Sequence, residues 1–487
     1  MLGDIIKKEI LENLLSHKFL FVFILCSVLI LFSVYIGAAD YVESKRQHDA
    51  NLAALAERMQ PPTTGEFFLE WEGYRIYRPP QILRTVVAGV EDVAGRGSNP
   101  NKQHETSLTE SKNLSNTILV LFGSLDIMFA VKFILSLFAI FFAYDAVSGE
   151  KEKGTLKLML SNNLSRSRLI SGKIIGNYIC MLLLFLTPLL MGIILLSIFP
   201  GISLSEGDWT RLFFIFIMFL LYISVFFALG IFVSALTTRS STSFLILLFL
   251  WIGLVIIIPG IAVIVAGHVR PVPSSSFLVA RKSQFRSENQ SSVIAEYSVK
   301  SKELTARLQQ RQAELQPLRQ EDPRRYQEEM AKLMEESSKL SLARDQEIND
   351  KVGAYNAQID RDYQLKKDAQ QSLAKNLSRI SPASAMTFGS MALARTGTDE
   401  YDRFLSATRD FRRLFVDWVS NLRGMNARVI AMPIDDSVTS TMPQFRFEPE
   451  RLGESLNRTL PDFALMAAMT ILLLAGAYFA FLRYDVR

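Results

Sequence analysis

Residues 144–176 read YDAVSGEKEKGTLKLMLSNNLSRSRLISGKIIG, a short charged stretch between two long apolar runs. A charge at the centre of a bilayer costs about 2.5 to 3.5 kcal/mol on insertion scales, so this stretch is expected in water between two membrane spans. We call its central part, residues 148–173, the elbow. Leu156, Met159 and Leu160 are spaced i, i+3, i+4, which predicts one apolar stripe on a short helix. Such a stripe needs a surface to pack against.

The apolar and charged residues of the chain are segregated along it. Of the 487 residues, 49% are hydrophobic and 21% are charged, which is typical of a polytopic membrane protein with sizeable aqueous domains. The net charge of +5 is mild and does not suggest binding to nucleic acid. Cys26 and Cys180 both fall in apolar runs, so the sequence predicts neither a disulfide framework nor a metal site.

Six apolar runs are each long enough to cross about 30 Å of hydrocarbon. The predicted division of the chain, in order, is as follows: an inner-surface helix (1–17), span 1 (18–38), a first outer domain (39–120), span 2 (121–147), the elbow (148–173), spans 3 to 5 (174–266), a second outer domain (267–460), and span 6 with a cytoplasmic end (461–487).

The positive charges of the short loops set the expected orientation. They cluster before span 1, in the elbow, at Arg239 between spans 4 and 5, and after span 6. By the positive-inside rule, both termini and the elbow are expected to be cytoplasmic and the two long loops extracytoplasmic.

The first 17 residues carry Ile6, Ile10 and Leu14 on one i, i+4 row, with charged residues elsewhere. This pattern predicts an amphipathic helix on the inner membrane surface; the alternative is a plain cytoplasmic extension of span 1.

The first outer loop is expected to begin as a helical extension of span 1 that stops at Pro61 and Pro62. After it, EFFLEWEGYRIYR at 66–78 alternates partly, with Glu72 and Gly73 at its middle, which is consistent with a small β-hairpin. The polar, glycine-rich stretch at 95–107 is expected to be a mobile loop.

The second outer loop is expected to hold a long helical hairpin at residues 283–376. This stretch has heptad-like apolar spacings and almost no glycine or proline. Asp322 followed by Pro323 is a good N-cap and first-turn pair, so we expect two helices and an antiparallel hairpin on the order of 50 Å long. The alternatives are a solvated single helix or a helix on the outer leaflet. The predicted fold class is thus all-α and polytopic, with about six transmembrane helices and a mainly helical extracytoplasmic domain.

No stretch of the sequence predicts catalysis. The gap from Gly149 to Gly154 fits a phosphate loop, but Thr155 and Leu156 follow in place of the lysine and hydroxyl residue that such a loop needs. The four histidines lack metal spacing, and no nucleophile and base stand in a recognisable order. We therefore expect no cofactor or metal in this chain.

Asp126 and Lys132 are ionisable residues in the first part of span 2. Intramembrane ionisable groups are candidates for a functional site, here a transport path. Both residues lie near an interface, so their side chains could also extend to water.

The segment from Asp145 through SGEKEKGTLKLML and SRSRLISGKIIG resembles the signature of permease subunits of ABC-2 type exporters. FGSLD at 122–126, RISPASAMTFGSMALARTGTDEYDRFL at 379–405 and MPQFRF at 442–447 add to the resemblance. They are similar to the members with a large extracytoplasmic insertion before the last span.

The resemblance implies that the elbow is a cytoplasmic coupling helix that docks on a separate ATPase subunit, where ATP and Mg would bind. The residues it assigns to coupling are Glu150, Lys151, Glu152, Gly154, Thr155, Leu156 and Met159. It further implies a bacterial inner-membrane complex, surrounded by lipid, of two ATPase subunits and two permeases, the second a copy or a homologue. On this interpretation Leu156→Asp weakens ATPase association.

A second hypothesis comes from a different class of protein. The chain would be a membrane-anchored scaffold, sensor or force-transmitting component whose extracytoplasmic helices bind a partner. The long heptad segment motivates it, and deletion of residues 283–376 discriminates between the two hypotheses. Nothing in the spans selects a substrate, and a membrane hydrolase ranks third because no catalytic arrangement stands out.

Overall fold

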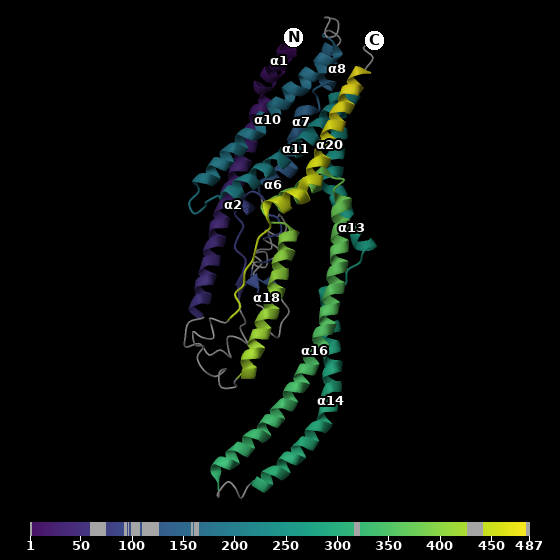
Figure 1. The fold of residues 1–487 in the computed structure, drawn as a ribbon. Helices are drawn as coiled ribbons and strands as arrows, with labels where there is room; N and C mark the ends of the chain where they lie inside the picture. Colours follow the sequence, from purple (N-terminus) through teal and green to yellow (C-terminus); the bar gives the residue numbers. More distant parts are fainter. Residues whose placement is uncertain are drawn as a thin grey trace. The chain divides into compact units, whose positions relative to one another are not determined.

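The computed structural model divides the chain into two compact units, residues 1–260 with 378–487 and residues 261–377. Figure 1 shows the helices of each unit. The described residues are 2–58, 75–91, 95, 97–98, 108–109, 126–156, 159, 165–315, 322–425 and 442–483.

Six helical stretches among these residues are long and apolar enough to cross a membrane, which confirms the predicted number of spans. Span 2 is interrupted: it runs through α6 (Ile127–Phe129), the π-helix η4 (Ala130–Leu135) and α7 (Ser136–Ala143) toward α8 (Ser148–Lys153). Span 5 is similar and comprises α12 (Ser240–Ile252), the π-helix η5 (Gly253–Ile257) and α13 (Ile258–Val269). The other spans are α2 (His17–Arg58), α10 (Arg166–Ile198), α11 (Glu206–Leu236) and α20 (Leu452–Leu482).

Helix α11 is the centre of the first unit. Its aromatic residues Phe219, Tyr222, Phe226 and Phe227 are at most 1% exposed. It packs against α7, α20 and α17 (Pro382–Ala394). The approach to α7 is close, because a Cβ on Gly230 would lie 2.4 Å from that of Ala143.

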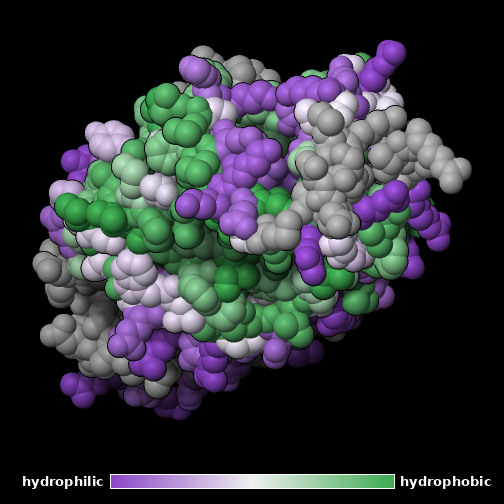
Figure 2. Space-filling model, turned by 90° about the horizontal axis from the view of Figure 1, so that it is seen from above, coloured by the Kyte–Doolittle hydropathy of each residue, from purple (hydrophilic) through white to green (hydrophobic). Residues whose placement is uncertain are grey.

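The outer faces of the spans are apolar, as lipid contact requires. Phe249 in α12, Ile194 in α10 and Phe32 in α2 are each more than half exposed. In the view from above, a broad hydrophobic area lies beside hydrophilic groups on the visible face (Figure 2).

The first predicted outer loop contains a small antiparallel sheet of three strands, β1 (Ile76–Tyr77), β2 (Gly97–Ser98) and β3 (Leu108–Thr109). Its register pairs Ile76 with Ser98 and Gly97 with Thr109. The middle of the predicted hairpin, at Glu72 and Gly73, lies outside the described residues, as do Pro61 and Pro62. Strand β1 falls within the stretch predicted to form the hairpin, but its partner β2 lies in the stretch 95–107 that was expected to be a loop. The sequence did not predict this pairing, because strands that are distant in the chain leave no local signal of it.

Helix α18 (Thr398–Met425), also in the first unit, builds a separate aromatic core. Its Phe404, Phe411 and Phe415 are buried together with Ile76 of β1. The rings of Phe445 and Phe447 pack against the Phe404 ring at 5.8 and 5.2 Å between centroids.

The second unit is the predicted helical hairpin. Its helices are α14 (Ser275–Leu315) and α16 (Pro323–Ser378), and Asp322 accepts a hydrogen bond from the Arg325 amide at 3.2 Å, as an N-cap does. Lys282 pairs with Asp360 at 2.7 Å and Tyr297 donates to Glu347 at 3.2 Å, so the helices run antiparallel. With 41 and 56 residues the helices are roughly 60 and 85 Å long at 1.5 Å per residue, which exceeds the expected length.

Candidate functional site

Helix α8 is the first part of the elbow. Its N-terminal end is hydrogen-bonded to span 4. The backbone amides of Val147 and Ser148 both donate to Oγ of Ser234 in α11, at 3.1 and 3.0 Å. These amides have no partner within α8, so the serine satisfies them. The helix ends at Gly154, whose φ of 73° is left-handed and favours glycine.

Two charged side chains of α8 bind the turn between α11 and α12; we call Lys151 and Glu152 the clip. The Lys151 ammonium donates to the carbonyls of Ala235 and Thr237, the latter at 3.0 Å. One Glu152 carboxylate oxygen accepts from the amide and the hydroxyl of Ser240, at 2.9 and 2.8 Å. A cation at a helix C-terminus and an anion at an N-terminus both match the helix dipoles. The clip therefore ties α8 to the ends of spans 4 and 5.

A buried ion triad joins α8 to two further helices. The Lys173 ammonium lies 2.6 Å from a carboxylate oxygen of Glu150 and 2.8 Å from one of Glu9. Asn177 donates to the other Glu9 oxygen at 3.3 Å. The side chains of Lys173 and Glu9 are 4% and 9% exposed, so the charges depend on one another. The triad consists of Glu9, Glu150 and Lys173.

The helix that supplies Glu9 is α1 (Leu2–Leu14), which confirms a helix at the N-terminal stretch. It packs along α10, where Gly172 and Gly176 leave room for Ile5 and for the Cβ of Glu9. The predicted apolar row of Ile6, Ile10 and Leu14 is half-buried, while Leu15 is 80% exposed. The buried face of α1 thus centres on Glu9, a residue that hydrophobic periodicity cannot reveal.

Leu156, at 1% exposed, lies in a core within the chain. It is buried with Val147, Leu169, Ile170 and Phe481, and Met159 packs on this cluster. The surface that the apolar stripe needs is therefore supplied by α10 and α20. Four residues at the end of α8 and just after it are exposed, and we call them the tip: Glu152, Lys153, Gly154 and Thr155.

The last span also closes on the elbow. Arg166, the first residue of α10, donates to the Leu482 carbonyl of α20 at 3.0 Å. Tyr478 donates to Ser167 at 2.9 Å. The C-terminal end of α20 is thereby fixed beside the beginning of span 3.

The candidate path residues do not lie with the elbow. Asp126 is the N-cap of α6: its two carboxylate oxygens accept from the amides of Phe129 and Ala88, at 2.7 and 2.8 Å. Lys132 lies in η4 and is half-buried. The structure thus gives Asp126 a local structural role. The Lys132 ammonium lies over the Phe133 ring, 5.2 Å from its centroid.

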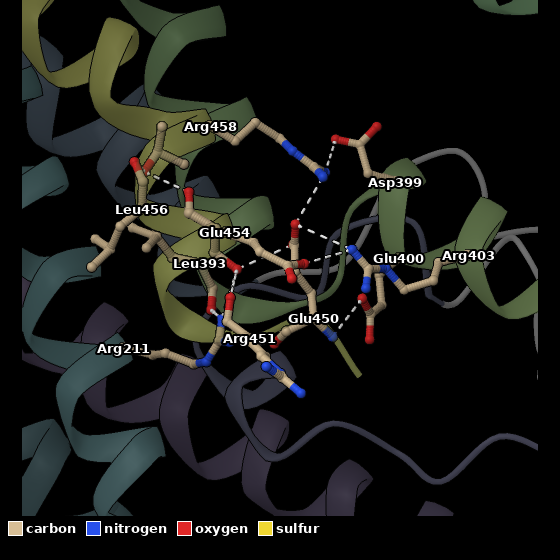
Figure 3. A network of polar contacts seen from close by, with 12 residues as sticks. Arg211, Leu393, Asp399, Glu400, Arg403, Glu450, Arg451, Glu454, Leu456 and Arg458 are labelled. Atoms are coloured by element: carbon tan, nitrogen blue, oxygen red, sulfur yellow. Dashed lines mark hydrogen bonds and ion pairs between the residues drawn. The ribbon is translucent and has the colours of Figure 1, made fainter. Parts of the chain in front are cut away.

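A second polar cluster, which sequence reasoning missed, surrounds Arg211 near the start of α11 (Figure 3). Its guanidinium donates to the carbonyls of Leu393 and Glu450, at 3.0 and 2.6 Å. The Glu450 carboxylate in turn lies 2.8 Å from Arg458. The cluster draws on RTGTDEYDR at 395–403, so the density of charges there was the signal that could have found it.

Glu400 is a buried acid of the same cluster. One of its oxygens accepts from the Glu450 amide at 3.3 Å, and the other has no hydrogen-bond partner among the described residues. Burial raises the pKa of the Glu400 carboxyl above its ordinary value, and Arg78 opposes that shift.

The six apolar helices and the elbow define a multi-pass α-helical membrane protein with a charged element that contacts α1, α10, α11, α12 and α20. A family model described as ABC-2 family transporter protein matches residues 4–486, and the chain belongs to this family. It is therefore a permease component of an ABC transporter, of a kind that is generally not itself catalytic. No protein with a curated description matches it.

Proposed function

We propose that the chain is the permease of an exporter powered by a separate ATPase, and that the ATPase docks on the exposed tip of the elbow. The observation that supports this most is the set of contacts of α8: the clip reaches α11 and α12, and the triad reaches α10 and α1. A displacement of α8 therefore strains the ends of spans 3, 4 and 5 together. Differential contacts of this kind allow a partner to shift a conformational equilibrium.

The test reverses charge at the tip and leaves the buried contacts alone. Lys153→Glu combined with Thr155→Glu should reduce co-purification of the ATPase from native membranes, while Lys45→Glu on α2 should not. Both sites are exposed, so the fold tolerates either change. Retention of the ATPase by the tip variant at the control level would refute docking at this surface.

Leu156→Asp should also weaken ATPase association. The expected cause is a disturbed elbow structure and not the loss of a direct contact with the ATPase. Leu156 is buried, so a carboxylate there disrupts the cluster under the elbow. Loss of association in this variant is expected together with a lower unfolding temperature. Intact association in Leu156→Asp would contradict the coupling role of the elbow.

The full assembly that we propose contains two ATPase subunits, which bind ATP and Mg, and a second permease. The positive charges at the elbow support a cytoplasmic position for it and for both termini, in a bacterial inner membrane. In this orientation the helical hairpin of the second unit is extracytoplasmic.

The scaffold or sensor hypothesis is favoured by one observation, the length of the hairpin. Helices α14 and α16 have 41 and 56 residues, and few of their described side chains are buried. Deletion of residues 283–376 should leave ATP-driven transport intact if the hairpin is accessory. Loss of function with the ATPase still bound would favour a partner at the hairpin.

A further inference from the structure

Lys132 lies in a distorted part of span 2. The π-helix η4 includes it, and π-helical turns are rare and occur frequently at functional sites. A half-buried cation in a membrane span is costly unless something compensates it.

The other buried or half-buried cations of the described spans contact an oxygen that compensates them. Lys173 pairs with two carboxylates, those of Glu150 and Glu9. Lys151, Arg166 and Arg211 donate to backbone carbonyls. Lys132 differs: among the residues that the structure describes, its ammonium contacts only the Phe133 ring, 5.2 Å from the centroid.

The carboxylate of the same span does not pair with Lys132. Both oxygens of Asp126 accept from backbone amides, those of Phe129 and Ala88. These two contacts involve both oxygens of Asp126, and no ion pair between Asp126 and Lys132 is found among the described residues.

The backbone of Lys132, in contrast, is firmly held by two other spans. Its carbonyl accepts from the hydroxyls of Tyr222 and Ser136, at 2.7 and 2.6 Å. Ser136 in turn accepts from the Trp251 indole at 2.8 Å. A fixed backbone that carries an ammonium with no oxygen partner among the described residues is suited to hold a ligand.

We propose that Lys132 binds an anionic group, phosphate or carboxylate, of the molecule that the transporter carries. This inference rests on the exporter function proposed above. A charge-assisted hydrogen bond to a partly desolvated ammonium is stronger than a neutral one. Removal of the charge should therefore weaken binding by about tenfold to a hundredfold.

The test measures probe binding to the purified chain in neutral detergent by fluorescence anisotropy. The probes are carboxyfluorescein, a soluble carboxylate, and fluorescent phosphatidylglycerol, with fluorescent phosphatidylcholine as the zwitterionic comparison. Lys132→Met should weaken binding of one anionic probe at least tenfold and leave the zwitterionic probe unaffected. Lys132→Arg should keep most of the affinity, and Lys45→Met, at an exposed site, should match the wild type.

The probe that loses affinity identifies the source of the anionic group, lipid headgroup or soluble molecule. The proposal is overturned if Lys132→Met binds both anionic probes as the wild type does, if it loses the zwitterionic probe equally, or if the wild type binds neither anionic probe. ATPase co-purification with each variant is measured separately. If the ATPase does not co-purify with the wild type, the proposal that a separate ATPase powers the chain is refuted, and the binding result is unaffected.

Discussion

Lys173 is the cation on which α8, α10 and α1 meet. Its two carboxylate partners lie 2.6 and 2.8 Å away, in a place from which water is largely excluded. Buried ion pairs contribute little net stability, but loss of one partner is costly because the remaining charge has no solvent. The loss of a single charge at such a site is therefore expected to disturb the local structure strongly.

Lys173→Met should destabilise the protein by about 3 to 5 kcal/mol, because Glu9 and Glu150 then face each other without a cation. Thermal unfolding of the purified protein in detergent measures the effect. Lys153→Met, which removes the same charge at the exposed tip, is the control. If both variants unfold at the same temperature, the triad does not hold the elbow.

Glu400 should make stability depend on pH. An acid whose pKa is raised in the folded protein binds its proton more tightly there than in the unfolded chain. Its stabilising contribution to the free energy of unfolding is therefore fully present below its ordinary pKa of 4.5. This contribution is lost as the pH rises through the higher pKa of the folded state. Glu400→Gln should be more stable than the wild type at neutral pH, and the difference should shrink as pH falls toward 4.5.

Unfolding temperatures recorded across this pH range check the Glu400 prediction. Glu448→Gln is the matched control, since Glu448 is exposed. A difference between Glu400→Gln and the wild type that stays constant with pH would contradict the prediction.

Helix α8 is too short to be stable alone. Its six residues are fewer than an isolated helix needs in water. Ser234 at its beginning, the clip along its length and the Leu156 cluster after it supply the missing stability. The position of α8 therefore depends on the helices that it contacts, and a change in the position of α8 also changes its contacts with them.

Lys151→Met should loosen the turn between α11 and α12. The carbonyls of Ala235 and Thr237 lose their donor, and each lost hydrogen bond is worth about 1 kcal/mol, or about fivefold in local opening. Hydrogen exchange of the amides at 236–240 measures it. Lys153→Met on the same helix should leave this exchange unchanged, and equal exchange in both variants would show that the clip does not hold the turn.

The contact between α7 and α11 should tolerate no added methyl group. Gly230→Ala places a Cβ 2.4 Å from that of Ala143, which should cost about 1 to 3 kcal/mol as the helices separate. Gly260→Ala meets nothing within 4 Å and should be neutral or stabilising. Thermal unfolding of the two variants compares them; equal behaviour would mean that the helices are not closely packed there.

At the scale of the whole molecule, the sequence predicted what local patterns encode. The six spans follow from runs of apolar residues, and the hairpin follows from heptad spacing with the break at Asp322 and Pro323. The elbow was located by its charges. Its internal contacts were not predicted, because Glu9 and Lys173 are 164 residues apart in the chain and no local pattern pairs them. The same holds for Leu156, whose cluster includes Phe481 from the last span.

The closure of α20 on the elbow has a consequence for biogenesis. Arg166 and the Leu482 carbonyl that it binds are 316 residues apart, so the ribosome must synthesise span 6 before the cluster around Leu156 can close. Chains fold progressively from the N-terminal side as they are made. A nascent or truncated chain without span 6 therefore leaves the Leu156 cluster exposed, so the elbow reaches its final structure only when the whole chain has been made.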